Sequence, residues 1–189
     1  TPMNLNLTQV AAWLPGAQRV GDAGVCVQRV HTDTRSLQPG ELYFALRGPS
    51  FDGNAFVAAA ARAGAAGAVV ERLDRDVELP QILVADGQQA LSGAAGAWRD
   101  RYSGCVLGVA GSNGKTTTKE MLAAILGQRG TCLATRGNLN NHIGVPLTLL
   151  RIEPRHDFAV IEIGANHAGE VEALAAIAKP RIGLVTNAG

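Results

Sequence analysis

The stretch that decides the fold of this chain is Gly108-Val-Ala-Gly-Ser-Asn-Gly-Lys-Thr-Thr-Thr-Lys-Glu-Met121. It follows an apolar run at 105–107 and opens into a helical pattern over residues 119–126. A strand, a glycine-rich turn, Gly-Lys-Thr and a helix, in that order, are the layout of a phosphate-binding P-loop. The stretch therefore predicts a site for the phosphates of a nucleotide at the start of a helix.

The residue types of this loop suit phosphate chemistry. Gly111 and Gly114 let the backbone turn tightly and aim successive N–H groups at one point. Lys115 adds a positive charge there, and Thr116 offers a hydroxyl to a magnesium ion that bridges the phosphates. We expect seven residues to bind the nucleotide: Gly111, Ser112, Asn113, Gly114, Lys115, Thr116 and Thr117.

The loop departs from the common P-loop pattern, because Val109 stands where that pattern has its first glycine. The Rossmann pattern G-x-G-x-x-G also fails, since the glycines at 108, 111 and 114 are spaced by three. A glycine-rich turn without any ligand is the alternative interpretation. The position of Lys115 and Thr116 between a strand and a helix weighs against it.

The composition excludes several classes of protein. The 189 residues carry a formal net charge of +1, which gives no electrostatic reason to expect a nucleic acid or a membrane surface as partner. The hydrophobic content of 47% argues against disorder. No apolar run reaches the roughly 18 residues of a membrane span. We therefore expect no membrane insertion. Because Cys26, Cys105 and Cys132 each lie in an apolar segment and lack metal-ligand spacing, we also expect a reduced cytoplasmic protein with buried thiols.

Turn signals and apolar runs divide the chain into two α/β halves. In residues 3–84, an alternating strand at 25–30 and other short apolar strands accompany an alanine-rich helix at 54–64, which implies a sheet covered by helices. A predicted helix at 88–101 follows and could bridge the two domains. In the second half, residues 85–189, four strands alternate with helices, at 105–110, 132–135, 158–163 and 182–186.

Ligands of parallel sheets bind beyond the carboxyl ends of the strands. The P-loop, the polar loop 136–142, Glu162 and Asn187 all fall at such ends, so we expect them to converge. Glu162 stands in an apolar strand, where a buried carboxylate is costly unless it is paired or binds a metal. We favour a magnesium ligand; the alternative is an outward-facing glutamate on an exposed edge.

Other polar residues near these strand ends have two interpretations. His167 is either a ligand or a helix-entry histidine bonded to backbone, whereas His31 and His156 are expected to be structural or solvent-exposed. The asparagine-rich segment 138–141 is either turn chemistry or a substrate-binding loop.

The loop Ala110-Gly-Ser-Asn-Gly-Lys-Thr-Thr117 resembles the ATP loop of the Mur ligases, which are cytoplasmic, ATP-dependent amide-forming enzymes of bacterial cell-wall synthesis. The resemblance covers essentially the whole chain. The stretches similar to the uridine-nucleotide domain of the muropeptide-extending members are 32–36, 39–48 and 51–53. The stretches similar to the member that adds D-alanyl-D-alanine are 137–146 and 161–170.

This resemblance implies a ligase that uses ATP and Mg²⁺. The γ-phosphoryl group of ATP would pass to the terminal carboxylate of UDP-N-acetylmuramoyl-tripeptide, and the amine of D-alanyl-D-alanine would attack the acyl phosphate to give an amide, ADP and phosphate. Lys115 and Glu162 would be catalytic, and Thr116 and Glu162 would hold the metal. The substrate candidates are Thr34, Arg35, Arg47 and Phe51 for the uridine end, and Asn138 and Asn141 for the muropeptide.

Members of the family continue with a histidine loop, a carbamylated lysine and a third domain, none of which is present in this sequence. The resemblance therefore implies an N-terminal portion with an incomplete P-loop domain, monomeric and inactive by itself. A sibling Mur ligase, a folyl-polyglutamate synthetase, a small-molecule kinase and a non-catalytic nucleotide-binding module stay open as alternatives. The uridine-type stretches weigh against the folate enzyme and the kinase, and residues 138–141 weigh against the sibling that adds the third residue of the peptide.

Overall fold

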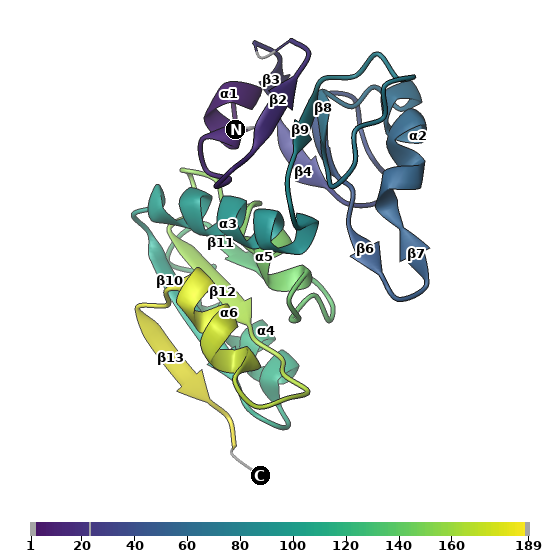
Figure 1. Cartoon of the computed structure of the whole chain (residues 1–189). Coiled ribbons are helices and arrows are strands. Elements are labelled where there is room, and N and C mark those ends of the chain that lie inside the picture. The colour runs from purple at the N-terminus through teal and green to yellow at the C-terminus, as the bar shows by residue number, and fades with distance from the viewer. Residues whose placement is uncertain (1–2, 23, 188–189) are drawn as a thin grey trace. The chain divides into compact units, whose positions relative to one another are not determined.

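The chain folds into two compact α/β units that divide between Ala94 and Ala95 (Figure 1). The computed structural model describes residues 3–22 and 24–187. The division falls inside helix α3 (Gly87–Asp100), ten residues beyond the boundary expected from the sequence. The predicted α/β class with parallel sheets is confirmed.

The first unit, up to Ala94, is built on a five-stranded sheet. Four of its strands are parallel, and the edge strand β2 is antiparallel to its neighbour. In spatial order the strands are β2 (Gln18–Val20), β9 (Gln81–Leu83), β8 (Gly67–Val70), β5 (Glu41–Phe44) and β4 (Arg29–His31). Two small antiparallel pairs join it: β1 (Leu5–Asn6) with β3 (Cys26–Val27), and β6 (Arg47–Gly48) with β7 (Phe51–Asp52).

A single strand expected at 25–30 is in fact two strands, β3 and β4, in different sheets. The interruption is at Gln28, whose N–H donates to the carbonyl of Gly40 and whose carbonyl accepts from the N–H of Met3. These partners are distant in sequence, so the alternating pattern alone did not reveal the break. The helices of this unit are α1 (Leu7–Ala11), the 3-10 turn η1 (Gly53–Phe56) and α2 (Val57–Arg62).

The core of the first unit lies between α2 and the central strands. Val57 and Ala60 of α2 pack with Tyr43, Ala68 and Val70 of the sheet, and all five are buried. The helix ends where the sequence predicted, because Gly64 adopts a left-handed conformation with φ of 85°.

The second unit, from Ala95 onward, contains a wholly parallel four-stranded sheet. In spatial order its strands are β11 (Cys132–Ala134), β12 (Phe158–Glu162), β10 (Cys105–Ala110) and β13 (Ile182–Val185). All four were predicted to within one residue at either end. Cys105 and Cys132 are half-buried on two strands that flank β12, whereas Cys26 in the first unit is exposed, so the expectation of three buried thiols was wrong.

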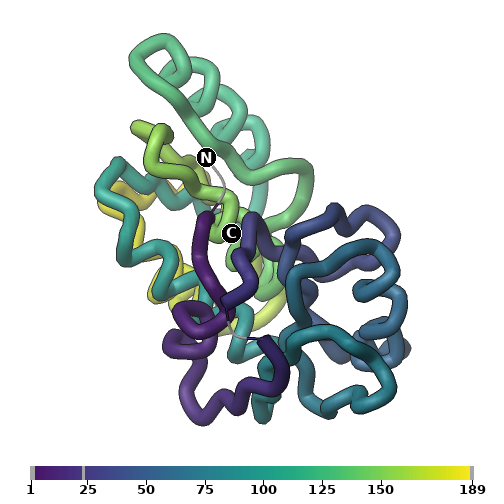
Figure 2. Tube along the Cα trace, turned by 90° about the horizontal axis from the view of Figure 1, so that it is seen from above, coloured from purple at the N-terminus to yellow at the C-terminus, as the bar shows by residue number. Residues whose placement is uncertain are grey.

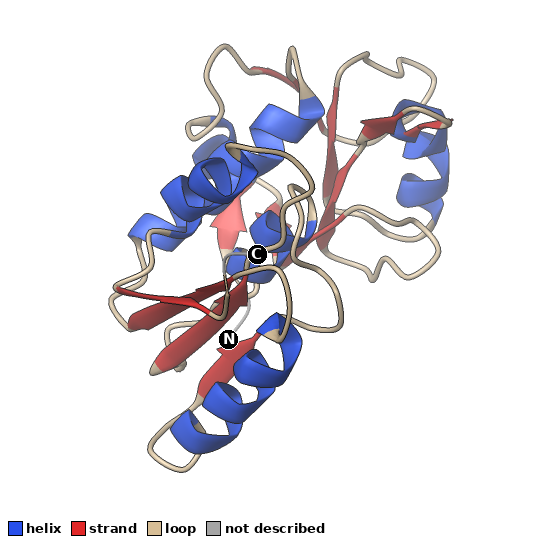
Figure 3. Cartoon of the chain, turned by 90° about the horizontal axis from the view of Figure 1, so that it is seen from below, coloured by secondary structure: helices blue, strands red, loops and turns tan. Residues whose placement is uncertain are grey.

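Helices cover both faces of this sheet. In Figure 1, α4 (Lys115–Leu126) lies behind the strands and α6 (Glu170–Ala178) in front, and Figure 3 shows the same two layers from below. Figure 2 shows α4 running beside the returning strand β11. This layering is what right-handed crossovers between parallel strands produce.

Helix α5 (Gly144–Leu149) was not predicted, because Gly144 and Pro146 are typical of a loop. Proline is tolerated in the first turn of a helix, and Val145 and Leu149 are fully buried, so packing outweighs the poor helix propensity. Among the described residues, no helix has both the length and the apolar character needed to cross a membrane.

Candidate functional site

The P-loop connects the end of β10 to the start of α4, as the sequence predicted. Its turn needs glycine twice: Gly114 has φ of 77° at the helix start, and Gly111 has φ of 133° and touches Thr186, so that a side chain would collide there. The N–H groups of the first turn of α4 have no partners within the helix, and the positive end of the helix dipole lies there. These are the features that favour an anion.

The first half of the P-loop is tied to the residues that follow β13. The N–H groups of Ser112 and Asn113 donate to Asn187 Oδ1 at 3.1 and 2.9 Å, and the hydroxyl of Thr186 donates to the carbonyl of Asn113 at 2.5 Å. The side chain of Asn187 thus satisfies two N–H groups expected to cradle phosphate. The N–H groups at 114–117, at the start of α4, are the ones that this contact leaves for a ligand.

Lys115 folds back over its own loop. Its Nζ donates to the carbonyl of Gly111 at 2.7 Å and to that of Ser112 at 3.2 Å. An ammonium group has three donors, so the charge is held at the loop with a donor to spare for a phosphate oxygen.

Glu162 lies at the centre of the site. It ends β12, between β10 and β11, and only 1% of its surface is exposed, which excludes the alternative of an outward-facing glutamate on an exposed edge. Its Oε1 accepts from Thr116 Oγ1 at 3.2 Å and from Asn140 Nδ2 at 2.7 Å. Its Oε2 is buried and has no hydrogen-bond partner among the residues that the structure describes. The predicted convergence of the P-loop, the 136–142 loop and Glu162 is therefore confirmed.

A buried carboxylate oxygen without a partner is costly unless something positive reaches it. Mg²⁺ binds one or two protein oxygens and takes its remaining ligands from phosphates and water. Glu162 and the adjacent hydroxyl of Thr116 fit that demand. In the described part of the chain, no three His, Cys, Asp or Glu residues gather into a metal cluster, so the candidate magnesium site is the two-ligand one.

The 136–142 loop supplies a residue that the sequence analysis did not single out, Asn140. Its side chain bonds Glu162, and its carbonyl accepts from the N–H of Gly164 at 2.8 Å. Asn141, a predicted substrate residue, uses its Oδ1 to accept from the N–H groups of Ile143 and Gly144 at the start of α5. Asn138 is exposed. The asparagine run drew attention to this loop, but the sequence did not indicate that Asn140 is the asparagine that bonds the carboxylate.

Three of the histidines make local contacts with backbone N–H groups or have their own N–H bonded nearby. His167 is exposed, and its N–H donates to Glu170 Oε2 at the entry to α6. The backbone N–H groups of Asn166 and His167, which both donate to this oxygen, lower the pKa of Glu170. His156 is buried, which lowers its pKa, and its Nδ1 accepts from the N–H of Glu153. The Nδ1 of His31 accepts from two backbone N–H groups nearby. The structural role expected for His31 and His156 agrees with these bonds.

In the first unit, the predicted substrate residue Arg35 forms a bidentate pair with Asp33. The distances are 2.9 Å from Nε to Oδ1 and 2.6 Å from Nη2 to Oδ2. The hydrogen bonds from Arg35 lower the pKa of Asp33 to about 2. The Arg35 side chain is 88% exposed, and Thr34 beside it is part-exposed, so both face solvent.

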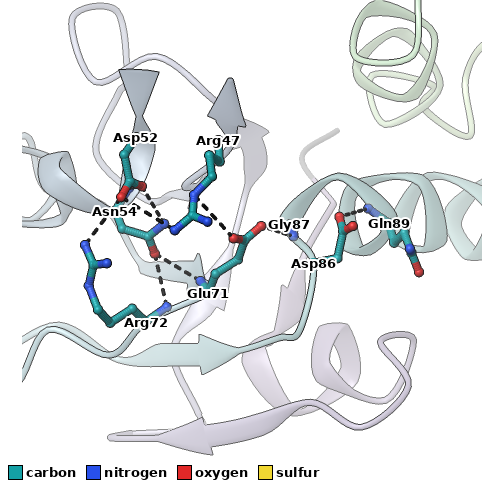
Figure 4. Close-up of polar contacts among 8 residues, drawn as sticks. All are labelled: Arg47, Asp52, Asn54, Glu71, Arg72, Asp86, Gly87 and Gln89. Carbon is teal, nitrogen blue, oxygen red and sulfur yellow. Dashed lines mark hydrogen bonds and ion pairs between the residues drawn. The ribbon is translucent and has the colours of Figure 1, made fainter. Parts of the chain in front are cut away.

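Arg47 lies between two carboxylates, as Figure 4 shows. Its guanidinium is 3.9 Å from Asp52 Oδ2 and 3.9 Å from Glu71 Oε2, and its side chain is 56% exposed. Glu71 also accepts from the N–H of Gly87 at the start of α3, at 2.7 Å. The positive charge proposed for a diphosphate is therefore already offset by acidic neighbours.

Asn54 organises this network and was not predicted as a functional residue. Its Nδ2 donates to Asp52 Oδ1, while its Oδ1 accepts from the N–H groups of Glu71 and Arg72 (Figure 4). Phe51, on the neighbouring hairpin, is 52% exposed. The structure brings Arg47 and Phe51 onto one hairpin, β6–β7.

Comparisons with known proteins match this arrangement. The sequence profile of the Mur ligase middle domain matches residues 109–189. The chain is 45% identical over 186 residues to the UDP-N-acetylmuramoyl-tripeptide–D-alanyl-D-alanine ligase of Escherichia coli, covering 98% of this chain and 40% of the relative. It is 49% identical over 168 residues to the protein of the same name from Synechocystis, covering 86% and 36%.

Solved structures agree with the sequence relatives. A crystal structure of MurF from Acinetobacter baumannii matches with a TM-score of 0.93 and 37% identity, covering all of this chain and 42% of that one. MurF ligase from Thermotoga maritima in complex with ADP matches with a TM-score of 0.76 and 32% identity, covering 85% and 38%. The chain spans about two fifths of the length of the curated relatives it matches.

Proposed function

Because this chain belongs to the Mur ligase family, we propose that it binds ATP and UDP-N-acetylmuramoyl-tripeptide within a ligase that joins the tripeptide to D-alanyl-D-alanine. The observation that carries the proposal is the 45% identity, across 98% of the chain, to the Escherichia coli relative that bears this name. The proposed reaction belongs to peptidoglycan precursor synthesis, and because it uses ATP we propose that it takes place in the cytoplasm.

In this proposal the second unit binds the nucleotide. The N–H groups at the start of α4 hold phosphate oxygens, and Lys115 neutralises the negative charge that develops as the phosphoryl group moves to the tripeptide carboxylate. The ADP complex of the Thermotoga maritima relative supports a nucleotide at this fold. Catalysis of this kind consists mainly of positioning and charge stabilisation, which the rigid loop supplies.

Thr116 and Glu162 hold magnesium in the same proposal. The unpartnered buried Oε2 of Glu162 is the acceptor that fits the ion. Bound there, the ion would neutralise phosphate charge. Asn140 keeps the carboxylate turned toward Thr116 through its bond to Oε1.

The first unit binds the uridine end of the substrate, with Thr34, Arg35, Arg47 and Phe51 as proposed contacts. In domain terms, we propose a substrate-binding domain over 3–84 and a P-loop domain over 85–189. Asn138 and Asn141 are proposed contacts for the muropeptide, and the protein is proposed to act as a monomer. A non-catalytic nucleotide-binding module is the second candidate function, because phosphate binding at the start of α4 does not by itself require catalysis.

Calorimetry on this chain tests the proposal. We expect UDP-N-acetylmuramoyl-tripeptide to bind, UDP-glucose to bind more weakly, and ADP to bind in a magnesium-dependent way that Lys115→Ala abolishes. Absence of binding to the UDP-linked tripeptide would overturn the assignment. A protein that continues this chain to the length of its relatives should form the amide with D-alanyl-D-alanine; binding without any amide product there would favour the non-catalytic module.

A further inference from the structure

Lys119 is a lysine with no exposed surface, one turn into α4. Lysine is almost never fully buried unless its charge is paired. Its Nζ donates to the carbonyl of Thr135 at 2.8 Å and lies 2.7 Å from Glu120 Oε1. Neither the P-loop pattern nor the reaction proposed above uses this ammonium group.

Thr135 connects Lys119 to the proposed metal site. It is buried just after β11, where the 136–142 loop begins, and all three of its polar groups are bonded. Its carbonyl accepts from Lys119, its N–H donates to Val160 at 3.0 Å, and its hydroxyl accepts from the N–H of Glu162 at 2.9 Å. A single buried threonine thus joins helix α4 to the backbone of the proposed magnesium ligand.

These contacts close a ring. Thr116 and Lys119 are three residues apart on α4, so they lie on neighbouring positions of one helix face. Thr116 Oγ1 donates to Glu162 Oε1, and Lys119 reaches the same glutamate through Thr135. The same set of bonds therefore connects one face of α4 to the end of β12 where Glu162 lies.

Filling space does not explain the ammonium group. Burying a charge costs free energy, and a methionine of similar length would occupy the same volume without that cost. What methionine cannot do is donate a hydrogen bond to the carbonyl of Thr135. A function of the bond from Lys119 to Thr135 would explain why a charged side chain is buried at this position.

We propose that Lys119 is a positioning residue that, through Thr135, holds Thr116 and Glu162 at the spacing a divalent cation requires. The inference deepens the proposed function and rests on its magnesium site. It predicts that Lys119 affects the magnesium-dependent part of nucleotide binding while leaving the magnesium-free part unchanged.

The test compares two variants, Lys119→Met and Thr135→Val, with two matched controls. Glu120→Gln removes the exposed charge beside Lys119 but keeps the bond to Thr135, and Thr148→Val removes a buried hydroxyl that donates to the carbonyl of Gly144 in α5. Calorimetry measures the affinity for the β,γ-imido analogue of ATP with and without Mg²⁺. Both variants should lose most of the magnesium-dependent gain, by about tenfold, and both controls should keep it.

A second readout needs no nucleotide. Hydrogen exchange followed by NMR reports the N–H of Glu162, which donates to Thr135. This N–H should exchange at least severalfold faster in Lys119→Met than in the wild type or Glu120→Gln. If Lys119→Met does not fold, Thr135→Val decides the magnesium measurement.

The two proposals fail in different ways. A wild-type chain that binds no nucleotide overturns the proposed function, and the exchange rate of the Glu162 N–H then decides alone whether Lys119 positions this residue. A folded Lys119→Met variant with the wild-type magnesium gain and the wild-type exchange rate overturns the inference about Lys119.

Discussion

The side chains proposed to meet ligands are held differently in the two units. In the second unit, Glu162 and Lys119 are buried, and their bonds run between elements that are far apart in sequence. In the first unit, Arg35 and Arg47 are mostly exposed, and their charged partners include carboxylates close by in sequence, Asp33 and Asp52. One site is built into the fold, whereas the other lies on its surface.

This difference predicts how each unit would bind its ligand. A phosphate site made of backbone N–H groups and buried side chains is preorganised, so little has to be rearranged on binding. An arginine already paired with a carboxylate must share or leave that partner when a diphosphate binds. We therefore expect substrate binding by the first unit to depend more strongly on ionic strength than nucleotide binding by the second.

The largest effect should come from Lys115→Ala. Its ammonium is needed where charge develops in the transition state, and loss of one such donor costs about 10²–10³ in turnover. Turnover in a protein that extends this chain to the length of its relatives measures the effect. Lys179→Ala, which removes an exposed lysine paired with Asp100, is the control for a lost positive charge. Turnover by Lys115→Ala within a few-fold of the control would contradict the assignment of the P-loop.

Gly53→Ala should destabilise the fold of the first unit without changing its surface charges. An added β-carbon would lie 2.5 Å from the carbonyl oxygen of Leu46, and backbone cannot move aside easily. The expected loss is about 1–3 kcal/mol in the free energy of unfolding, measured by urea denaturation. Gly96→Ala, where a β-carbon meets nothing within 4 Å, is the matched control and should leave stability unchanged or raised. Magnesium-dependent binding of ADP, a property of the second unit, should persist in Gly53→Ala.

Glu162→Gln should weaken the magnesium dependence of nucleotide binding by about tenfold. The amide keeps the size of the side chain but removes the charge that a hard cation requires. A magnesium titration monitored by calorimetry with ADP measures the change, and Glu172→Gln, on the exposed part of α6, serves as control. Superimposable titrations of Glu162→Gln and the wild type would show that Glu162 does not bind the metal.

The smallest effect should be that of Arg35→Ala on the pH dependence of stability. The folded pKa of Asp33 lies at about 2, below its ordinary value of 3.8, so the pair stabilises the fold above pH 3.8 and this contribution is lost as the pH falls through about 2. The variant should raise the pKa of Asp33 toward its ordinary value of 3.8, because it removes the side-chain bonds and keeps the one from the backbone N–H of residue 35, and an NMR titration of the carboxyl carbon detects this rise. Its stability at neutral pH should change little because the pair is exposed.

Local patterns made the second unit predictable. The strand β10, its turn and helix α4 follow from neighbouring residues, and all four strands of the sheet are apolar runs. Helix α5 was missed because its stability comes from the burial of Val145 and Leu149, which no local preference reveals. The break at Gln28 was missed for the same reason, since its partners Met3 and Gly40 are distant in sequence.

The residues of the candidate site also separate into those that local sequence marks and those that depend on contacts distant in sequence. Lys115, Thr116 and Glu162 could be predicted because a motif and an apolar strand mark them. Lys119 could not, because a lysine in a helical pattern is normally solvated, and its burial depends on the packing of α4 against β11 and β12, which no local pattern reveals. The choice among the asparagines was also beyond local patterns, since it depends on where the loop lies against Glu162.

The position of β12 between β10 and β11 also decides how the thiols of the second unit respond to an oxidant. Cys105 and Cys132 both lie opposite Phe158, one on each side, so their Cα atoms are two strand spacings apart, about 10 Å. A disulfide requires Cα atoms within about 7 Å. Oxidation therefore cannot cross-link them unless β12 leaves the sheet, and each should react singly with a thiol reagent, more slowly than the exposed Cys26. A cross-link between Cys105 and Cys132 would report the opening of this sheet.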